Sequence, residues 1–535
     1  MKEVAVAKIN DLHNGQMQQI AVEDVQILLA KINDKFYATS AFCTHYGAPL
    51  EKGILCGERI VCPWHNACFN GISGQQEEPP GLDSLAYFNT RIEGDRVFVR
   101  LPDKIPQQRT LQMSRYVPNV DERTFVIVGA GAAGMNAVEV LRQQGFQGKI
   151  ILVSAEEKLP YDRTKLSKNY LQGKAQEDAL SLRSCKFYDQ YDIELRFSRV
   201  VTQVDINKKV VIFANNCRVE YDALLLATGG KPRKLDIPGT DLGNIFTLRQ
   251  PEDVNSILDA VKAAKQALVI GSSFIGMEAA ASLTQQGLEV TVVSPDEVPF
   301  KKILGTEIGR MLQKLHEKNG VTFKFGTKAT EFTGNGKVKY AILENGEKIA
   351  TDLVIVGIGV EPNTSYLKGI ELNQKDNSIP VNEYLQTEIE DIYAAGDIAS
   401  FPYAPMGEKT RIEHWRLAAQ QGRIAAKNML HQYTKDKQTV SQIVPFFWSG
   451  QYDLKLRYVG HAEKWDEVYI DGDLDRAEFL AFYLQNNKVM AVAGVGRDQE
   501  IAAISELMRL QKMPDAAAVK SQEINWLNLL TTNNY

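Results

Sequence analysis

The stretch TFVIVGAGAAGMNAVEVLRQQG, residues 124–145, decides the fold of the largest part of this chain. An apolar run that fits a buried strand leads into a glycine-rich turn, and the turn opens a helical pattern. Such a turn lets backbone N–H groups and the positive end of the helix dipole approach a pyrophosphate. We therefore predict a dinucleotide-binding α/β unit, whose candidate cofactor-binding residues at the turn are Gly129, Gly131, Ala133 and Gly134.

A second unit of the same kind follows in QALVIGSSFIGMEAAASLTQQG, residues 266–287. The segment YAAGD, 393–397, is assigned to the first unit but follows the second unit in the sequence. The second unit is therefore predicted to be inserted into the first. Ser273 stands where the middle glycine is usual, which makes the approach of a pyrophosphate tighter. The candidate residues for a nicotinamide dinucleotide at this turn are Gly271, Ser273, Ile275 and Gly276.

Two short loops near the N-terminus carry a different chemistry. CTHYGAPL, 43–50, and CPWHNACF, 62–69, each place one thiolate and one imidazole on a tight turn. A [2Fe–2S] cluster with two cysteines on one iron and two histidines on the other needs this arrangement. A structural zinc site has the same composition, but zinc fingers order both cysteines before both histidines. We favour the cluster, with the ligands Cys43, His45, Cys62 and His65.

These two loops resemble the Rieske family of iron–sulfur domains. High-potential members of that family donate hydroxyl groups to the cluster, whereas the matching positions here are Ala67 and Phe69. The resemblance therefore implies a low-potential, ferredoxin-like centre. Asn66 replaces the glycine that is usual after the second histidine.

The segment LPYDRTKLSK, 159–168, resembles the PYxRPPLSK segment of ferredoxin-reductase and apoptosis-inducing-factor flavoproteins. The resemblance implies that Arg163 and Lys168 contact a flavin, with Lys168 near its isoalloxazine ring. Thr164 and Lys165 stand where the family usually has two prolines. Independently of the family, the spacing after the first turn places the candidate Glu156 to accept hydrogen bonds from an adenosine ribose, with Glu157 as the alternative.

Three later segments complete the resemblance to FAD-binding proteins: LLLATGG at 224–230, DIYAAGD at 391–397 and RIEHW at 411–415. In the family, the last aspartate of the second segment, here Asp397, hydrogen-bonds the ribityl chain. The third segment begins a helix whose first amides approach the pyrimidine edge of the flavin. The further candidate FAD-binding residues are Val201, Thr228, Gly229, Arg233, Glu413, His414 and Trp415.

The resemblance also assigns residues to the nicotinamide. Glu278 resembles the glutamate that reaches toward it, and GIGVEPN at 357–363, with Gly359, resembles the opposite wall of that site. We take Lys168 and Glu278 as the candidate catalytic residues. Ser294 ends the next strand where NAD-selective proteins often have glutamate, and no arginine cluster follows, so the choice between NADH and NADPH stays open.

These patterns predict a multidomain fold. A small antiparallel β Rieske domain at 1–103 and a linker at 104–123 precede two α/β Rossmann-like domains and a C-terminal α+β reductase domain. The FAD-binding domain is predicted at 124–247 and 365–438, the NAD(P)H-binding domain at 248–364, and the reductase domain at 440–535.

Composition narrows the partners. The chain has 535 residues, 44% of them hydrophobic and 24% charged, and a net charge of −5, which gives no reason to expect nucleic acid or an anionic membrane as a partner. The N-terminus has no leader pattern, and no run is apolar enough to span a membrane, so a cytoplasmic protein is expected. The oligomeric state stays open.

The predicted centres suggest one function. A nicotinamide gives two electrons as a hydride, a [2Fe–2S] cluster takes one, and a flavin converts between the two modes. We predict an FAD-dependent NAD(P)H oxidoreductase that passes electrons to its Rieske cluster and on to an unidentified acceptor, such as a redox protein. The alternatives are a ferredoxin-reductase component of an oxygenase system and a redox-sensing interaction protein with an NADH-dependent conformation.

Overall fold

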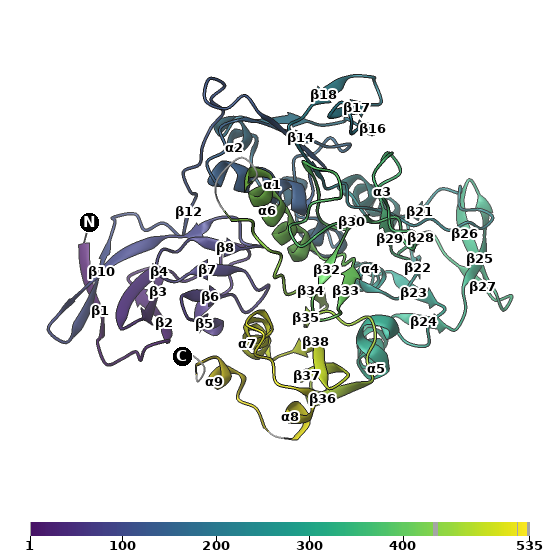
Figure 1. The fold of residues 1–535 in the computed structure, drawn as a ribbon. Coiled ribbons are helices and arrows are strands. Elements are labelled where there is room, and N and C mark those ends of the chain that lie inside the picture. The colour runs from purple at the N-terminus through teal and green to yellow at the C-terminus, as the bar shows by residue number, and fades with distance from the viewer. Residues whose placement is uncertain (1, 432–436, 522, 532–535) are drawn as a thin grey trace.

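The computed structural model describes residues 2–431, 437–521 and 523–531 (Figure 1). Residues 432–436 of the predicted FAD-binding segment, and 522 and 532–535 of the predicted C-terminal domain, lie outside the described residues, as does residue 1. Among the helices that the structure describes, none has both the length and the apolar character needed to cross a bilayer.

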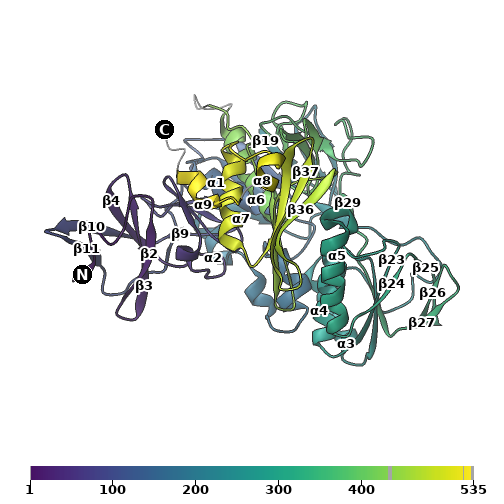
Figure 2. The same cartoon turned by 90° about the horizontal axis from the view of Figure 1, so that it is seen from below.

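The N-terminal region consists of two antiparallel sheets, at one end of the molecule in both views (Figures 1 and 2). Alternation of buried and exposed residues, as in β11, places one face of the larger sheet on an apolar core. The larger sheet has the order β1-β11-β10-β4-β3-β2, with β1 (Lys2–Lys8), β2 (Met17–Val22), β3 (Val25–Ile32), β4 (Lys35–Ser40), β10 (Tyr87–Glu93) and β11 (Arg96–Leu101). The smaller has β5 (Ile54–Cys56), β6 (Arg59–Val61), β7 (Cys68–Asn70) and β8 (Gln76–Glu78) in sequence order.

The next region is built on a five-stranded parallel sheet. Its central strands are buried except at the first residue of β13, because elements cover both faces, and this explains their continuous apolar runs. Its order is β15-β14-β13-β19-β31, with β13 (Thr124–Val128), β14 (Lys149–Val153), β15 (Ile193–Arg196), β19 (Ala223–Leu226) and β31 (Ile392–Ala394). Helices α1 (Ala132–Gln143) and α6 (Trp415–His431) pack closely together, since a Cβ on Gly422 would lie 2.0 Å from the backbone oxygen of Ala133.

Smaller elements border this sheet. The linker strand β12 (Gln108–Arg109) pairs with β9 (Ser84–Leu85) and so remains attached to the N-terminal region. The remaining elements are α2 (Cys185–Gln190), β16 (Val201–Asp205), β17 (Val210–Phe213), β18 (Arg218–Glu220), β30 (Ile379–Pro380), β32 (Ala399–Tyr403) and β33 (Glu408–Thr410).

A second parallel sheet repeats the plan. Its order is β21-β28-β22-β23-β24, with β21 (Ile245–Phe246), β22 (Gln266–Ile270), β23 (Glu289–Ser294), β24 (Thr322–Phe325) and β28 (Leu353–Val356). The helices are α3 (Pro251–Val261), α4 (Phe274–Gln285) and α5 (Lys301–Lys318), and an antiparallel sheet adds β25 (Ala329–Asn335), β26 (Lys337–Leu343) and β27 (Lys348–Ala350). Strands β20 (Gly230–Pro232) and β29 (Val360–Pro362) pair where the chain crosses between the two parallel-sheet regions.

The last region is an antiparallel sheet with helices beside it, and it lies between the N-terminal region and the second parallel sheet (Figure 1). Its order is β34-β35-β38-β37-β36, with β34 (Phe446–Gln451), β35 (Leu454–Gly460), β36 (Glu467–Asp473), β37 (Glu478–Gln485) and β38 (Lys488–Val495). The helices are α7 (Asp498–Arg509), α8 (Ala516–Ser521) and α9 (Trp526–Thr531). The predicted fold class is therefore confirmed.

The N-terminal and C-terminal regions share an apolar core. Ile54, Val61 and Cys68 of the small sheet belong to one buried cluster with Phe446 and Leu480 of the last sheet. A contact of this kind fixes the two regions against each other, because separating them would expose apolar surface to water.

A buried guanidinium holds the same junction. Arg416, near the start of α6, has a side chain only 2% exposed. Its Nε donates to the backbone oxygens of Asn66 and Pro79, each at 3.1 Å, and its Nη2 lies 2.5 Å from a carboxylate oxygen of Glu78. Asn66 also donates from Nδ2 to Ser505 Oγ in α7 at 2.9 Å.

We predict that Arg416→Met destabilises the protein by about 2–4 kcal/mol, because the buried backbone oxygens of Asn66 and Pro79 lose their donor and the Glu78 carboxylate keeps only Arg59 as a cation. Thermal unfolding measures the loss. Arg476→Met is the matched control, since that side chain is 83% exposed and its removal should change little. An equal loss of stability in both variants would contradict the role of the junction.

A buried histidine should make the stability of the fold depend on pH. Burial lowers the pKa of His316 to about 4, and its Nε2 lies 2.8 Å from Gln451 Oε1. An unfolded chain binds a proton on this histidine near pH 6.5, so it binds more protons than the folded chain between these values. Stability should fall by about 2 kcal/mol from this group as the pH drops from 7 to 5. The melting temperature should therefore decrease over this range, and less steeply in His316→Gln than in the exposed control His13→Gln.

Candidate functional site

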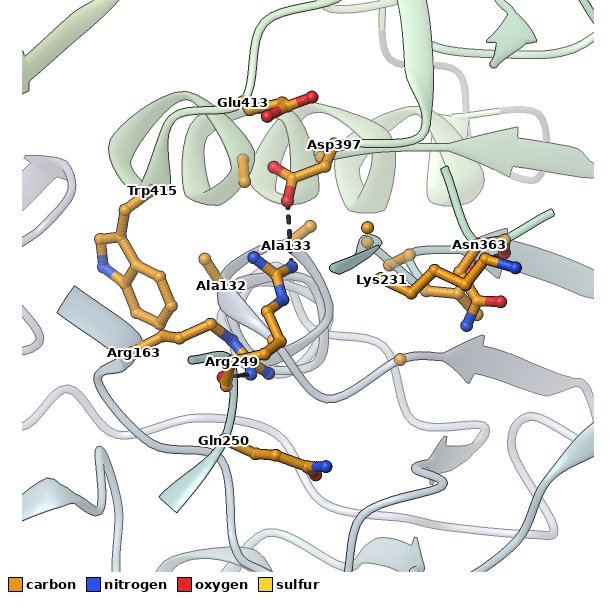
Figure 3. A pocket seen from close by; sticks show the side chains of 18 of the residues that line it. Ala132, Ala133, Arg163, Lys231, Arg249, Gln250, Asn363, Asp397, Glu413 and Trp415 are labelled. Carbon is orange, nitrogen blue, oxygen red and sulfur yellow. Dashed lines mark hydrogen bonds and ion pairs between the residues drawn. The ribbon is translucent and has the colours of Figure 1, made fainter. Parts of the chain in front are cut away.

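One cavity of about 640 Å³ collects most of the predicted cofactor residues (Figure 3). It lies beside the first glycine-rich turn and also receives side chains from α4 and β34. The predicted residues that line it are Gly129, Gly131, Ala133, Glu156, Arg163, Lys168, Val201, Thr228, Gly229, Ile275, Glu278, Asp397, Glu413, His414 and Trp415. Six others do not line it, namely Gly134, Arg233, Gly271, Ser273, Gly276 and Gly359.

Several of these six residues shape the turns or the crossover instead. Gly271 has φ +106°, and a Cβ there would lie 2.3 Å from the Gly357 oxygen, so the second turn requires glycine. A Cβ on Gly134 would lie 1.8 Å from the Gly129 oxygen. Arg233 donates from Nε to the Val360 oxygen at 3.1 Å and so braces the crossover between the two parallel-sheet regions.

At one end of the cavity, the predicted ribose acceptor is already engaged. The Glu156 carboxylate accepts from Arg163 Nη2 at 2.9 Å and from the Tyr161 hydroxyl at 2.7 Å. Burial raises the pKa of Glu156, but Arg163 and Tyr161 lower it by more, so the pKa lies below its ordinary value. The predicted flavin contact Arg163 thus neutralises Glu156, and its other nitrogen donates to the Arg249 backbone oxygen.

Sequence patterns missed several polar residues that line this cavity, among them Lys231, Arg249, Gln250 and Asn363 (Figure 3). Arg249 is the most informative of them, because its Nη2 donates to Asp397 Oδ2 at 3.1 Å. Asp397 comes after β31 and Arg249 after β21, so only the folded chain brings them together. One weak local signal could have marked Arg249 and Gln250: they directly precede Pro251, and proline is common as the first residue of a helix, here α3.

The two candidate catalytic residues form an ion pair in which the carboxylate is buried. Lys168 Nζ lies 2.7 Å from Glu278 Oε2, and the Glu278 side chain is 4% exposed. Ser167 donates to the same oxygen, and Ser449 Oγ of β34 donates to Oε1 at 2.7 Å. Lys168 also interrupts a π-helical turn, Leu166–Tyr170, with non-helical backbone angles. Segments far apart in sequence therefore place one cation at the wall of the cavity.

The donor groups of the cavity fit a flavin dinucleotide. Gly129 has φ +115°, and a Cβ there would lie 2.1 Å from the Ala227 oxygen, so the turn can present its backbone amides only as glycine. A Cβ on Gly131 would meet open space, which leaves room for a phosphate group. His414 Nδ1 is buried and has no hydrogen-bond partner among the described residues, and burial lowers the pKa of His414 to about 3. His414 therefore lines the cavity as a neutral imidazole.

The four predicted cluster ligands form two pairs, one of cysteines and one of histidines. Cys43 and Cys62 are buried and hydrogen-bond each other, and this contact, with burial, raises the pKa of Cys43. His45 Nδ1 and His65 Nδ1 lie 3.1 Å apart. Burial and the neighbouring His45 hold the pKa of His65 well below its usual value, so its ring is neutral. Two thiols in one pair and two imidazole nitrogens in another are the donor set that a Rieske cluster requires.

The second ligand loop keeps its shape without the usual glycine. Asn66 has φ +59°, a left-handed conformation that asparagine tolerates better than most residues. Its backbone oxygen accepts from Arg416 and its side chain donates to Ser505. The substitution therefore fastens the loop to the rest of the protein.

Comparison with known proteins agrees with this geometry along the chain. Residues 2–89 match the family model of the Rieske [2Fe-2S] domain, residues 123–422 that of the pyridine nucleotide-disulphide oxidoreductases, and residues 446–529 that of the reductase C-terminal domain. The chain belongs to the pyridine nucleotide-disulphide oxidoreductase family. It is an FAD-dependent NAD(P)H oxidoreductase of the ferredoxin-reductase type with a Rieske domain.

Relatives of this oxidoreductase differ in how much of the chain they cover. Human apoptosis-inducing factor 3 is 40% identical over 516 residues, which cover 95% of this chain and 84% of the relative. Putidaredoxin reductase CamA of Pseudomonas putida is 34% identical over 381 residues, 70% of this chain and 89% of the relative. The solved covalent complex of putidaredoxin reductase with putidaredoxin aligns with a TM-score of 0.71 and 30% identity, covering 77% of this chain and 98% of that one.

We predict that Lys168→Met slows reduction of the bound flavin by NADH about 10-fold or more, because it removes a cation beside the site that receives negative charge. Anaerobic stopped-flow absorbance measures this rate. Lys174→Met, an exposed lysine in the same stretch, is the control and should reduce its flavin at the wild-type rate. If both variants behave as wild type, the pair with Glu278 has no role in the reaction.

Proposed function

We propose that this oxidoreductase passes electrons from NADH or NADPH, through FAD, to a Rieske cluster in the same chain and on to an external redox acceptor. When bound, FAD supplies the conversion between a hydride and single electrons. The chain's own residues hold and orient the carriers and exclude water between them. The observation that carries the proposal is Trp448, which lines the flavin cavity while its ring contacts His65, with ring centroids 4.3 Å apart.

The proposed roles divide the chain by carrier. The segments 124–247 and 365–438 would hold FAD, with the first glycine turn on its pyrophosphate, Asp397 on its ribityl chain and Glu413, His414 and Trp415 along its ring. The segment 248–364 would hold the nicotinamide dinucleotide on the turn that begins at Gly271. The segment 1–103 would hold the cluster on Cys43, His45, Cys62 and His65, with 104–123 as linker, and 440–535 would close the cavity through β34.

Two features support a protein as the acceptor. The relatives include proteins named rhodocoxin reductase, putidaredoxin reductase and rubredoxin-NAD(+) reductase, and one solved relative is a complex of putidaredoxin reductase with putidaredoxin. The cluster region of this chain takes one electron at a time, which suits such an acceptor. We therefore propose a one-electron redox protein as the acceptor, with NAD(P)H as the donor.

The proposal is tested by adding NADH anaerobically to the protein with both centres loaded. We expect the flavin absorbance to bleach and a reduced Rieske signal to appear in the electron paramagnetic resonance (EPR) spectrum. Bleaching without cluster reduction would contradict the internal path.

Substitution of Trp448 tests the carrying observation. Trp448→Leu should slow cluster reduction about 10-fold or more and slow flavin bleaching by NADH much less, because leucine still fills the cavity wall while the ring contacts with His65 and His45 are lost. Trp448→Phe is the matched control that retains an aromatic ring, and it should react faster than the leucine variant. Freeze-quench EPR measures the cluster step and stopped-flow absorbance measures the flavin step. Equal rates of cluster reduction in all three proteins would exclude a role for this side chain.

A further inference from the structure

The segment that borders the flavin cavity also reaches the first cluster loop. Asp162 lies directly before Arg163, which lines the cavity, and its carboxylate accepts a short hydrogen bond from the Tyr46 hydroxyl. The same oxygen, Oδ2, lies 3.9 Å from Nε2 of His45. A residue of the FAD-binding region thus places a negative charge against a predicted cluster ligand of the N-terminal region.

The carboxylate is held in this position from its other side. Asp162 is 3% exposed, and its Oδ1 accepts from the Thr164 backbone N–H at 3.0 Å and from Thr164 Oγ1 at 2.6 Å. Both oxygens thus accept hydrogen bonds, Oδ2 from Tyr46 and Oδ1 from Thr164, as an ionised carboxylate does. The group is therefore held as a fixed anion.

The two residues that depart from the PYxRPPLSK segment build this arrangement. A proline in place of Thr164 would supply neither the N–H nor the hydroxyl that binds Asp162. Lys165 Nζ lies 5.5 Å from the centre of the Tyr46 ring and donates to the Ala179 oxygen at 2.8 Å. Both substitutions thus serve contacts with the first cluster loop.

The orientation of His45 determines which of its nitrogens faces Asp162. Nδ1 of His45 faces Nδ1 of His65, which leaves Nε2 as the nitrogen that faces the carboxylate. A carboxylate beside the outer nitrogen of a ligating histidine fixes the ring orientation and raises its basicity as a ligand.

We propose that Asp162 is a positioning residue for the cluster ligand His45, and that its fixed negative charge lowers the reduction potential of the Rieske cluster. The inference rests on the proposed function, because it requires the cluster on Cys43, His45, Cys62 and His65. Its physical basis is that reduction adds one negative charge to the cluster, and a nearby anion that is shielded from water opposes that addition.

The test uses the full chain with both centres loaded. The midpoint potential of the cluster is measured by an EPR-monitored redox titration in wild type, Asp162→Asn, Asp162→Glu and the control Asp178→Asn, whose carboxylate is exposed. We expect Asp162→Asn to shift the potential to a more positive value and to change the EPR line positions. Asp162→Glu keeps the charge and should remain closer to wild type, and Asp178→Asn should match wild type.

The outcomes separate the inference from the proposed function. If the wild-type protein shows no Rieske signal after chemical reduction, the proposed function fails. If the wild-type signal is present but Asp162→Asn keeps the wild-type potential and line positions, the inference fails alone. Loss of the cluster in Asp162→Asn but not in Asp162→Glu supports the inference through ligand positioning. Equal shifts in both variants, or loss of the cluster in both, would contradict a role for the charge.

Discussion

The arrangement of the molecule depends on the first turn of α6. Arg416, the second residue of that helix, is buried and donates to the backbone of Asn66 and to Glu78, which belong to the N-terminal region. The residues just before it, His414 and Trp415, line the flavin cavity. One helix start therefore fixes the distance between the cavity and the second cluster loop. A guanidinium buried among carbonyl and carboxylate oxygens tolerates little displacement, because each lost contact leaves a buried polar group without a hydrogen-bond partner.

This junction is the common centre at which the separate regions of the chain meet. The apolar cluster shared by the N-terminal and C-terminal sheets adds to it, and Trp448 lies between the cavity and His65. Glu278 joins the same centre, since its carboxylate binds Lys168 from the first unit and Ser449 from β34. In the putidaredoxin system named among the solved structures, reductase and partner are separate proteins. Here the cluster region is part of the chain, and its loops are held by buried contacts.

Much of the fold was predictable because the deciding patterns are local. A buried strand, a glycine turn and a helix are contiguous in sequence, and the turn at Gly129 requires glycine for a reason that the structure makes explicit. The cysteine and histidine pairs are equally local, and the structure places the two cysteines against each other and the two histidines against each other. The pairing of Arg249 with Asp397 could not be predicted, since no local pattern links residues on different sheets. The contact of Tyr46 with Asp162 is of the same kind, although the threonine and lysine at 164 and 165 marked the segment as unusual.

We propose that electrons reach the cluster within one chain. The most direct test is the rate of cluster reduction after rapid anaerobic mixing with saturating NADH, measured by freeze-quench EPR over a tenfold range of protein concentration. We expect one first-order rate constant at every protein concentration, because the cavity and the cluster loops are fixed against each other. A rate that rises in proportion to protein concentration would show that electrons pass between molecules, and it would exclude the internal path.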